Sequence, residues 1–142
     1  MLATIRHEFV ETIPEHLDNG VVYVSLTYAT VVHNCCCGCG HEVVTPLHPR
    51  QWSLIFNGDT ISLTPSIGNW SFPCRSHYWI RAGQIRSARS FTETEIAKLR
   101  ADDQASLHDH YKSNTSTAPE KTTEPGKTWR AKLSRWARKR NR

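Results

Sequence analysis

The sequence lacks any apolar run of the roughly 18 to 20 residues that a transmembrane helix needs. Its first residues, 1–8, carry charges where a signal peptide needs an apolar core. Cysteine is scarce, and its odd number, five, does not suit a disulfide framework. Cys35, Cys36 and Cys37 are consecutive, too close along the backbone for easy unstrained pairing. We therefore expect a reduced, cytoplasmic protein without a transmembrane segment.

Acidic residues are absent from residue 127 onward, where eight of the 18 Lys and Arg residues lie. The net charge is therefore about −3 before this point, which argues against nucleic-acid binding by the body of the protein, and +8 after it. In this tail Trp129, Leu133 and Trp136 have helical spacing, which predicts a basic amphipathic helix. Such a helix could bind an anionic membrane, a nucleic acid or an acidic protein surface, or could simply be a solvated basic end.

Length and composition, 142 residues at 38% apolar content, indicate one domain with appendages. Residues 1–90 hold most of the β-branched and aromatic residues, in short bursts separated by turn residues. Asp18-Asn19-Gly20, Asn57-Gly58-Asp59 and Ala82-Gly83 are each typical of a hairpin turn. The strands expected around these turns are 5–13, 21–28, 52–56, 60–64, 77–81 and 84–86. We predict a mainly β fold, a small antiparallel domain of about six strands, with α+β as the alternative.

After residue 90 the pattern becomes helical. Thr92 and Glu95 fit a capping box at a helix start, and we expect a helix over 93–110 with a thin apolar stripe of Ile96, Leu99 and Leu107. Residues 113–127 contain no large apolar side chain and are expected to form a flexible linker to the basic tail. The predicted organisation is a β domain over 1–90, a helix over 91–112, and a disordered linker and tail over 113–142.

All five cysteines lie in two clusters, His33-Asn34-Cys35-Cys36-Cys37-Gly38-Cys39-Gly40 and Pro73-Cys74-Arg75-Ser76-His77. Thiolates and an imidazole at such spacing predict a structural zinc site that staples the β domain. If the first cluster is extended, side-chain alternation puts Cys35, Cys37 and Cys39 on one face, with Cys74 as the fourth ligand. If it folds as a knuckle around Gly38, Cys36 and Cys39 join Cys74 and His77 in a Cys3His or Cys2His2 set.

A zinc ion held by four thiolates leaves no coordination position for a substrate, so catalysis would need other residues. Ser66 follows a proline at a strand end, and Asn69 with the amides near Gly68 could bind an oxyanion. His77 and His33 are the candidate bases, and Ser76 is a second possible nucleophile. No carboxylate clearly orients either histidine, Asp59 and Glu42 being the nearest candidates.

Together these motifs resemble a bacterial family known as a domain of unknown function. Its members occur in Bub-type operons for ubiquitin-like conjugation, beside activating and conjugating enzymes and a ubiquitin-like modifier. The resemblance covers about residues 5–90 and is carried by Tyr23-Val24-Ser25-Leu26, His33-x-Cys35-x-Cys37-Gly38-Cys39-Gly40, Thr45-Pro46-Leu47, Trp52, Ser62-Leu63-x-Pro65-Ser66-Ile67-Gly68-Asn69-Trp70 and Pro73-Cys74-Arg75-Ser76-His77-Tyr78-Trp79-Ile80.

The resemblance implies a zinc-stabilised peptidase, of serine type, that trims a ubiquitin-like precursor or removes the modifier from targets. It implies a ubiquitin-like protein and its conjugating enzymes as partners. Carried onto this chain, the family's zinc ligands fall on Cys35, Cys37, Cys39 and Cys74, with Cys36 as a spectator. Its polar motifs fall on Ser66, Asn69, Ser76 and His77, and Ser66 is favoured as the nucleophile on chemical grounds.

Two other functions remain open at this stage. In a zinc metallopeptidase the ion would have three protein ligands and an activated water, with Glu42 as the base. A zinc-binding adaptor without catalytic activity would bind partners through its body and tail.

Overall fold

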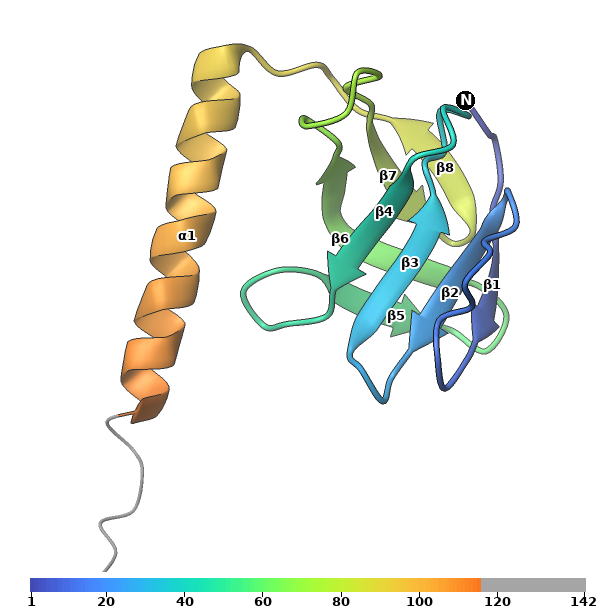
Figure 1. The fold of residues 1–142 in the computed structure, drawn as a ribbon, viewed down its shortest axis with the longest axis horizontal. Helices are drawn as coiled ribbons and strands as arrows, with labels where there is room; N and C mark the ends of the chain where they lie inside the picture. Colours follow the sequence, from blue (N-terminus) through green and yellow to red (C-terminus); the bar gives the residue numbers. More distant parts are fainter. Residues whose placement is uncertain (116–142) are drawn as a thin grey trace, which may run out of the picture. The chain divides into compact units, whose positions relative to one another are not determined.

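A computed structural model of the chain describes residues 1–115, and the predicted amphipathic helix and most of the predicted linker lie outside this range. The described part contains two four-stranded sheets and one helix (Figure 1). The first sheet has the order β1-β2-β3-β4 and the second β5-β6-β7-β8. The elements are β1 (Arg6–Phe9), β2 (Val21–Ser25), β3 (Thr30–Asn34), β4 (Glu42–Pro46), β5 (Ser53–Phe56), β6 (Ile61–Gly68), β7 (His77–Arg81), β8 (Gln84–Ser87) and α1 (Glu93–Thr115).

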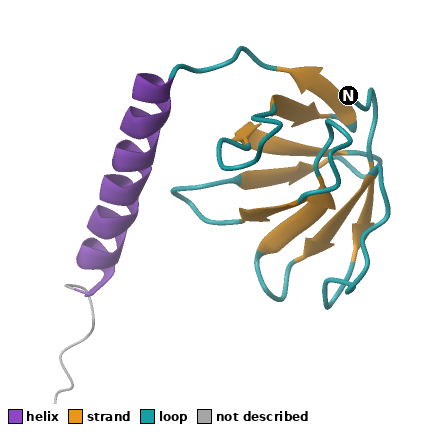
Figure 2. Cartoon of the chain, turned by 45° about the horizontal axis from the view of Figure 1, so that its top comes forward, coloured by secondary structure: helices purple, strands orange, loops and turns teal. Residues whose placement is uncertain are grey.

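The two sheets bury their apolar faces against one another in a single core. Val22, Val24 and Val31 contribute from the first sheet, and Leu63 and Ile80 from the second, each fully buried. Two isolated bridges, Thr4 with Gln84 and Leu47 with Trp52, connect segments next to one sheet with segments of the other. The predicted mainly β class is therefore confirmed, and the strands and the separate helix are distinguished in Figure 2.

The hairpins predicted from Asn57-Gly58 and Ala82-Gly83 are confirmed as the antiparallel pairs β5–β6 and β7–β8. Gly58 has a φ of 95° and Gly83 a φ of 69°, the left-handed conformation for which glycine is suited. In the first hairpin, the Asn57 carboxamide oxygen accepts hydrogen bonds from the amides of Asp59 and Thr60, at 3.0 and 2.7 Å. Local turn chemistry therefore sets the register of both pairs.

The hairpin predicted around Asp18-Asn19-Gly20 is wrong, because β1 and β2 run parallel. The predicted strand 5–13 ends at Phe9, and the chain then returns to the start of β1 before entering β2. The amide of Arg6 bonds the Gly20 carbonyl at 3.0 Å, and that of Val10 bonds the Val24 carbonyl at 2.9 Å. Asp18-Asn19-Gly20 therefore lies at the end of a long connection between two parallel strands and is not the turn of a hairpin.

Residues 1–115 contain eight strands, where about six were expected. The turn at Leu26–Ala29 ends the predicted strand 21–28, and Ala29 adopts a φ of 46° there. β3 and β4 were not predicted, and they form the hairpin that carries the first cysteine cluster in its loop. This hairpin is closed by a 2.8 Å hydrogen bond from the Cys35 amide to the His41 carbonyl.

The helix α1 begins where the capping box predicts and extends to Thr115, beyond the expected end at residue 110. The Thr92 hydroxyl accepts a hydrogen bond from the Glu95 amide at 3.3 Å, and the Glu95 carboxylate accepts one from the Thr92 amide at 2.8 Å. Ile96 is 2% exposed, but Leu99 is 38% exposed. The predicted apolar stripe therefore has one fully buried residue.

Replacement of the cap residue, Thr92→Ala, should destabilise the start of α1 by about 1 kcal/mol, because an N-cap side chain then no longer satisfies a helix amide. Hydrogen exchange at the amides of residues 94–97 measures this opening free energy directly. Thr94→Ala is the matched control, since it leaves both capping hydrogen bonds in place. Equal exchange rates in the two variants would contradict the assignment of Thr92 as the cap.

Candidate functional site

Four of the five cysteines form one cluster between the β3–β4 loop and the β6–β7 loop. The Sγ atoms of Cys35, Cys37, Cys39 and Cys74 all lie within 4.8 Å of one another. Individual sulfur–sulfur distances are 3.4 Å for Cys35–Cys37, 3.6 Å for Cys39–Cys74 and 3.9 Å for Cys35–Cys74. The chain thus brings residues separated by more than thirty positions into contact at one point.

The cluster fits a tetrahedral metal ion. Zinc–thiolate bonds of about 2.3 Å place the sulfurs of a tetrahedral site about 3.8 Å apart, close to the three distances above. Gly38 and Gly40 have φ values of 93° and 80°, so the loop bends in a way that residues with a Cβ rarely allow. Two N–H groups, the Cys39 amide and the Asn69 side chain, point at the sulfurs of Cys37 and Cys35, at 3.4 and 3.6 Å. The four cysteines could therefore hold a zinc ion.

The surroundings shift the pKa values of two thiols in the cluster in opposite directions. Burial, followed by hydrogen bonds with Cys39 and Cys35, raises the pKa of the Cys37 thiol to about 12. Burial acts in the same direction on Cys74, but hydrogen bonds with Ser76, Cys37 and Cys39 together lower the pKa of that thiol to about 7. Cys74 therefore loses its proton more readily than Cys37 does. A bound divalent ion would remove the remaining protons, as thiolate ligation requires.

Cys36 and His77, the other two candidate ligands, lie outside this set. Cys36 is fully buried in the core, and burial raises the pKa of its thiol to about 11. The His77 ring is engaged elsewhere: its Nε2 lies 2.8 Å from Ser66 Oγ. The geometry thus favours the four-thiolate set over the set with Cys36 and His77, although residues 35–39 form a turn, closed by a 3.0 Å hydrogen bond from the Gly38 amide to the Cys35 carbonyl, and are not extended.

The register of β6 against β7 brings Ser66 and His77 together. Ile67 pairs with Tyr78 and Gly68 with His77, so Ser66 is a diagonal neighbour of His77 on the same face of the sheet. Leu63 pairs with Ile80, which leaves three β6 residues, Thr64 to Ser66, opposite a single β7 residue. This irregularity contains Pro65, which has no N–H for the ladder and is tolerated at bulges. Bulges next to functional sites commonly re-aim a side chain, here that of Ser66.

The tautomer of His77 follows from its second hydrogen bond. Nδ1 lies 2.6 Å from the carbonyl oxygen of Arg89, and a carbonyl can only accept a hydrogen bond. In the neutral ring Nδ1 therefore carries the proton, and Nε2 is free to accept one from the Ser66 hydroxyl. This is the arrangement a general base needs beside a serine. The partner is a backbone group on the segment between β8 and α1, so neither Asp59 nor Glu42 is the hydrogen-bond partner of this ring.

Aromatic rings shield His77, which is 8% exposed. The Trp70 and Phe91 rings lie 4.9 and 4.8 Å from the His77 ring, both edge-on, and stack on one another at 5.2 Å. The indole of Trp70 also covers Gly68, where an added Cβ would lie 2.4 Å from its Cε2 atom. Gly68 is therefore required by this close approach of an aromatic ring.

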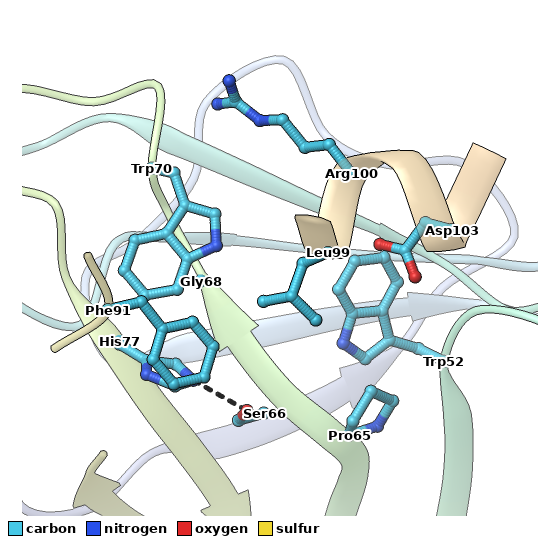
Figure 3. A pocket seen from close by; sticks show the side chains of 10 residues that line it. All are labelled: Trp52, Pro65, Ser66, Gly68, Trp70, His77, Phe91, Leu99, Arg100 and Asp103. Atoms are coloured by element: carbon cyan, nitrogen blue, oxygen red, sulfur yellow. Dashed lines mark hydrogen bonds between the residues drawn. The ribbon is translucent and has the colours of Figure 1, made fainter. Parts of the chain in front are cut away.

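A cavity of about 240 Å³ opens beside Ser66 and His77 (Figure 3). One wall is formed by strand residues and the other by α1. Its lining is mainly apolar and comprises Trp52, Pro65, Ser66, Gly68, Trp70, His77, Phe91, Leu99, Arg100 and Asp103. Of these residues, the sequence pattern singles out only Ser66, Gly68 and His77 as functional. Arg89, Phe91 and the α1 residues were not identified, because a backbone carbonyl and an isolated apolar side chain carry no motif.

The remaining predicted site residues form a buried network next to the cysteines. The Asn69 side chain donates to Ser76 Oγ at 2.9 Å, and Ser76 Oγ lies 3.0 Å from Cys35 Sγ. His33 is fully buried, its Nε2 is 2.9 Å from the Tyr78 hydroxyl, and burial lowers its pKa to about 4. Asn69 thus faces the cysteines. Within residues 1–115, neither His33 nor Ser76 forms a hydrogen bond with Ser66.

The variant Gly68→Ala should displace the Trp70 indole and destabilise the protein by about 1–3 kcal/mol, because its Cβ overlaps the ring. In a Trp70→Ala background the same substitution should cost much less, since the colliding atoms are absent. Urea unfolding of the four proteins gives the coupling energy of this double-mutant cycle. Additive costs would show that Gly68 is not required by the ring.

A comparison with protein families gives one match. Residues 9–88 match a family model described as "Bacterial ubiquitination-like system serine protease (BubE)". The matched segment contains Ser66, His77 and the four clustered cysteines, and α1 lies outside it. No curated protein and no solved structure gives a significant match. Among residues 1–115, no helix has the length and apolar character required to cross a bilayer.

Proposed function

The chain belongs to the serine protease family of bacterial ubiquitination-like systems, and on this premise we propose that Ser66 is its nucleophile and His77 its general base. The observation that carries the proposal is the 2.8 Å contact between Ser66 Oγ and His77 Nε2, with the opposite ring nitrogen bound to a carbonyl. We further propose that the enzyme cleaves at the C-terminus of a ubiquitin-like protein, either in its precursor or in a conjugate.

The proposed reaction follows from the tautomer. His77 Nε2 takes the Ser66 proton as Oγ attacks the carbonyl carbon of the scissile bond. The same nitrogen then gives this proton to the departing amine, which leaves an acyl group on Ser66. A water molecule, deprotonated by Nε2, attacks the acyl carbon and releases the carboxylate, and the proton returns to Ser66. The Arg89 carbonyl holds the ring throughout these steps.

The predicted roles of Asn69 and Ser76 change in this proposal. Their side chains bond one another and Cys35, so we assign both to positioning the β6–β7 turn. The oxyanion would then depend on backbone amides near Ser66 and not on the Asn69 carboxamide. His33, which is neutral and enclosed, would have a structural role in the same network.

The size of the cavity supports an extended substrate. A volume of about 240 Å³ is below the roughly 300–1,000 Å³ of pockets for drug-sized ligands. It can hold one or two residues of a peptide but no folded domain. A flexible C-terminal tail can enter it while the globular part of a ubiquitin-like protein stays outside.

We propose that the four cysteines hold zinc with a structural role. Four thiolates complete a tetrahedral shell, so the bound ion would cross-link the two loops without a free position for substrate. The same full shell disfavours the metallopeptidase alternative. Ser66 and His77 would then depend on the ion through the geometry of the β6–β7 hairpin.

A serine-directed fluorophosphonate tests the nucleophile. Wild type and Ser76→Ala should be labelled, Ser66→Ala should not, and His77→Gln should react at least a hundredfold more slowly because the base is lost. Intact-protein mass spectrometry measures the added mass, and circular dichroism checks that each variant folds. Labelling of folded Ser66→Ala at the wild-type rate would contradict the assignment.

Metal analysis tests the second proposal. Purified protein should contain one zinc per chain, and Cys39→Ser should lose most of it because one thiolate is missing. Cys36→Ser is the matched control, since that sulfur lies outside the cluster. Chelation should unfold the β domain and abolish labelling together. Equal zinc content in the two variants would overturn the ligand set.

A further inference from the structure

The helix α1 forms part of the cavity that contains Ser66. Leu99, Arg100 and Asp103 lie along one of its faces and line the same cavity as the serine (Figure 3). The start of the helix is fixed to the β domain by buried Ile96 and by the ion pairs Arg89–Glu95 and Arg75–Glu93. The wall opposite the strands is therefore supplied by a segment outside the family match.

We propose that α1 is the substrate-selecting wall of this enzyme, and that the space between Leu99, Trp52 and Trp70 binds an aliphatic side chain next to the cleaved bond. The inference rests on the proposed function and specifies its substrate. This is an extended peptide in which the scissile carbonyl belongs to an aliphatic residue of about the size of leucine.

The exposure of Leu99 supports this subsite. Leu99 follows Ile96 by three positions and therefore lies on nearly the same face of the helix. Ile96 is 2% exposed, whereas Leu99 is 38% exposed and lines the cavity. An apolar side chain bound there would cover Leu99 and be stabilised by the removal of apolar surface from water. The charged residues Arg100 and Asp103 are exposed at the same wall.

Trp52 provides a hydrogen-bond donor on the opposite side of the subsite. Its Nε1 is buried and has no hydrogen-bond partner within residues 1–115. In Figure 3 this nitrogen is on the side of the indole that faces Leu99 and Pro65. A buried N–H without a partner is costly, and a substrate carbonyl placed beside it would satisfy it. The subsite thus combines an apolar surface with one donor for the peptide backbone.

The cavity continues along the chain of a bound peptide. A second hollow, of about 140 Å³, is lined by Arg50, Gln51, Trp52, Pro65 and Asp103. It shares Trp52, Pro65 and Asp103 with the first cavity, so the two adjoin. An extended chain that enters beside Ser66 can therefore continue past Pro65 toward Arg50, with its side chains contacting α1 and the strands alternately.

Peptidyl diphenyl phosphonates phosphonylate an active-site serine and carry a chosen side chain next to the reacting phosphorus. They therefore test the subsite in the full-length protein. The probes are acetyl-Ala-Ala-X phosphonates in which X is the analogue of Gly, Leu or Phe, and intact mass gives the rate of modification. Wild type should react fastest with Leu. Leu99→Ala should raise the Phe-to-Leu rate ratio about tenfold because the pocket is larger, and Leu99→Phe should lower the Leu rate relative to Gly.

Leu107→Ala is the matched control, because it removes the same side chain from α1 beyond the cavity. Trp52→Phe should slow all three peptidyl probes three- to tenfold, because the donor to the peptide carbonyl is lost. Unchanged rate ratios in Leu99→Ala, or labelling of wild type by the fluorophosphonate alone, would overturn the subsite and leave the nucleophile assignment standing. If neither class of probe labels the folded wild type, the proposed function fails with it.

Discussion

The pairing of β6 with β7 is the constraint on which the rest of the site depends. Gly68 opposite His77, with extra residues inserted at Pro65, puts Ser66 diagonally across from the imidazole on the outer face of the sheet. On the inner face, the alternating residues Ile67 and Tyr78 are buried in the core. A slip of one residue would exchange these faces and expose core side chains, so burial of the core also fixes the separation of the serine and the histidine.

The cysteine cluster lies at the end of the β6–β7 hairpin. Cys74 lies in the β6–β7 loop, and the other three cysteines lie in the β3–β4 loop of the opposite sheet. The Asn69 amide bonds the Ser76 carbonyl at 2.8 Å, and the Asn69 side chain bonds Ser76 Oγ and Cys35 Sγ. These residues are immediate neighbours of Gly68 and His77 in the chain. A cross-link between the two loops would therefore restrict the strand ends that carry the reacting groups, which a core of this size could leave free to fray.

Features set by local chemistry could be predicted from the sequence. The Asn57-Gly58 and Ala82-Gly83 hairpins, the Thr92 cap and the mainly β class were confirmed because each depends on a few adjacent residues. The β1–β2 pair was wrongly predicted as antiparallel, since a turn sequence does not reveal the length of the connection that precedes it. The clustered cysteines and the proximity of Ser66 to His77 agree with the expected groupings, whereas their roles stay predictions. Arg89 and Leu99 could not be found, because their contributions arise only from tertiary placement.

The use of a backbone carbonyl to orient His77 has consequences for how such an enzyme would work. A carbonyl fixes the tautomer as well as a carboxylate does, but its partial charge stabilises the imidazolium less. Trp70 and Phe91 also cover the ring and limit the access of water to it. A dyad of this kind would lack the transition-state stabilisation that the carboxylate of a triad supplies. Contacts remote from the scissile bond, along α1 and with the folded part of a dedicated partner, would then have to supply the binding energy that aligns the carbonyl with Ser66. Low intrinsic reactivity and strict substrate selection would then both follow from the proposed dyad.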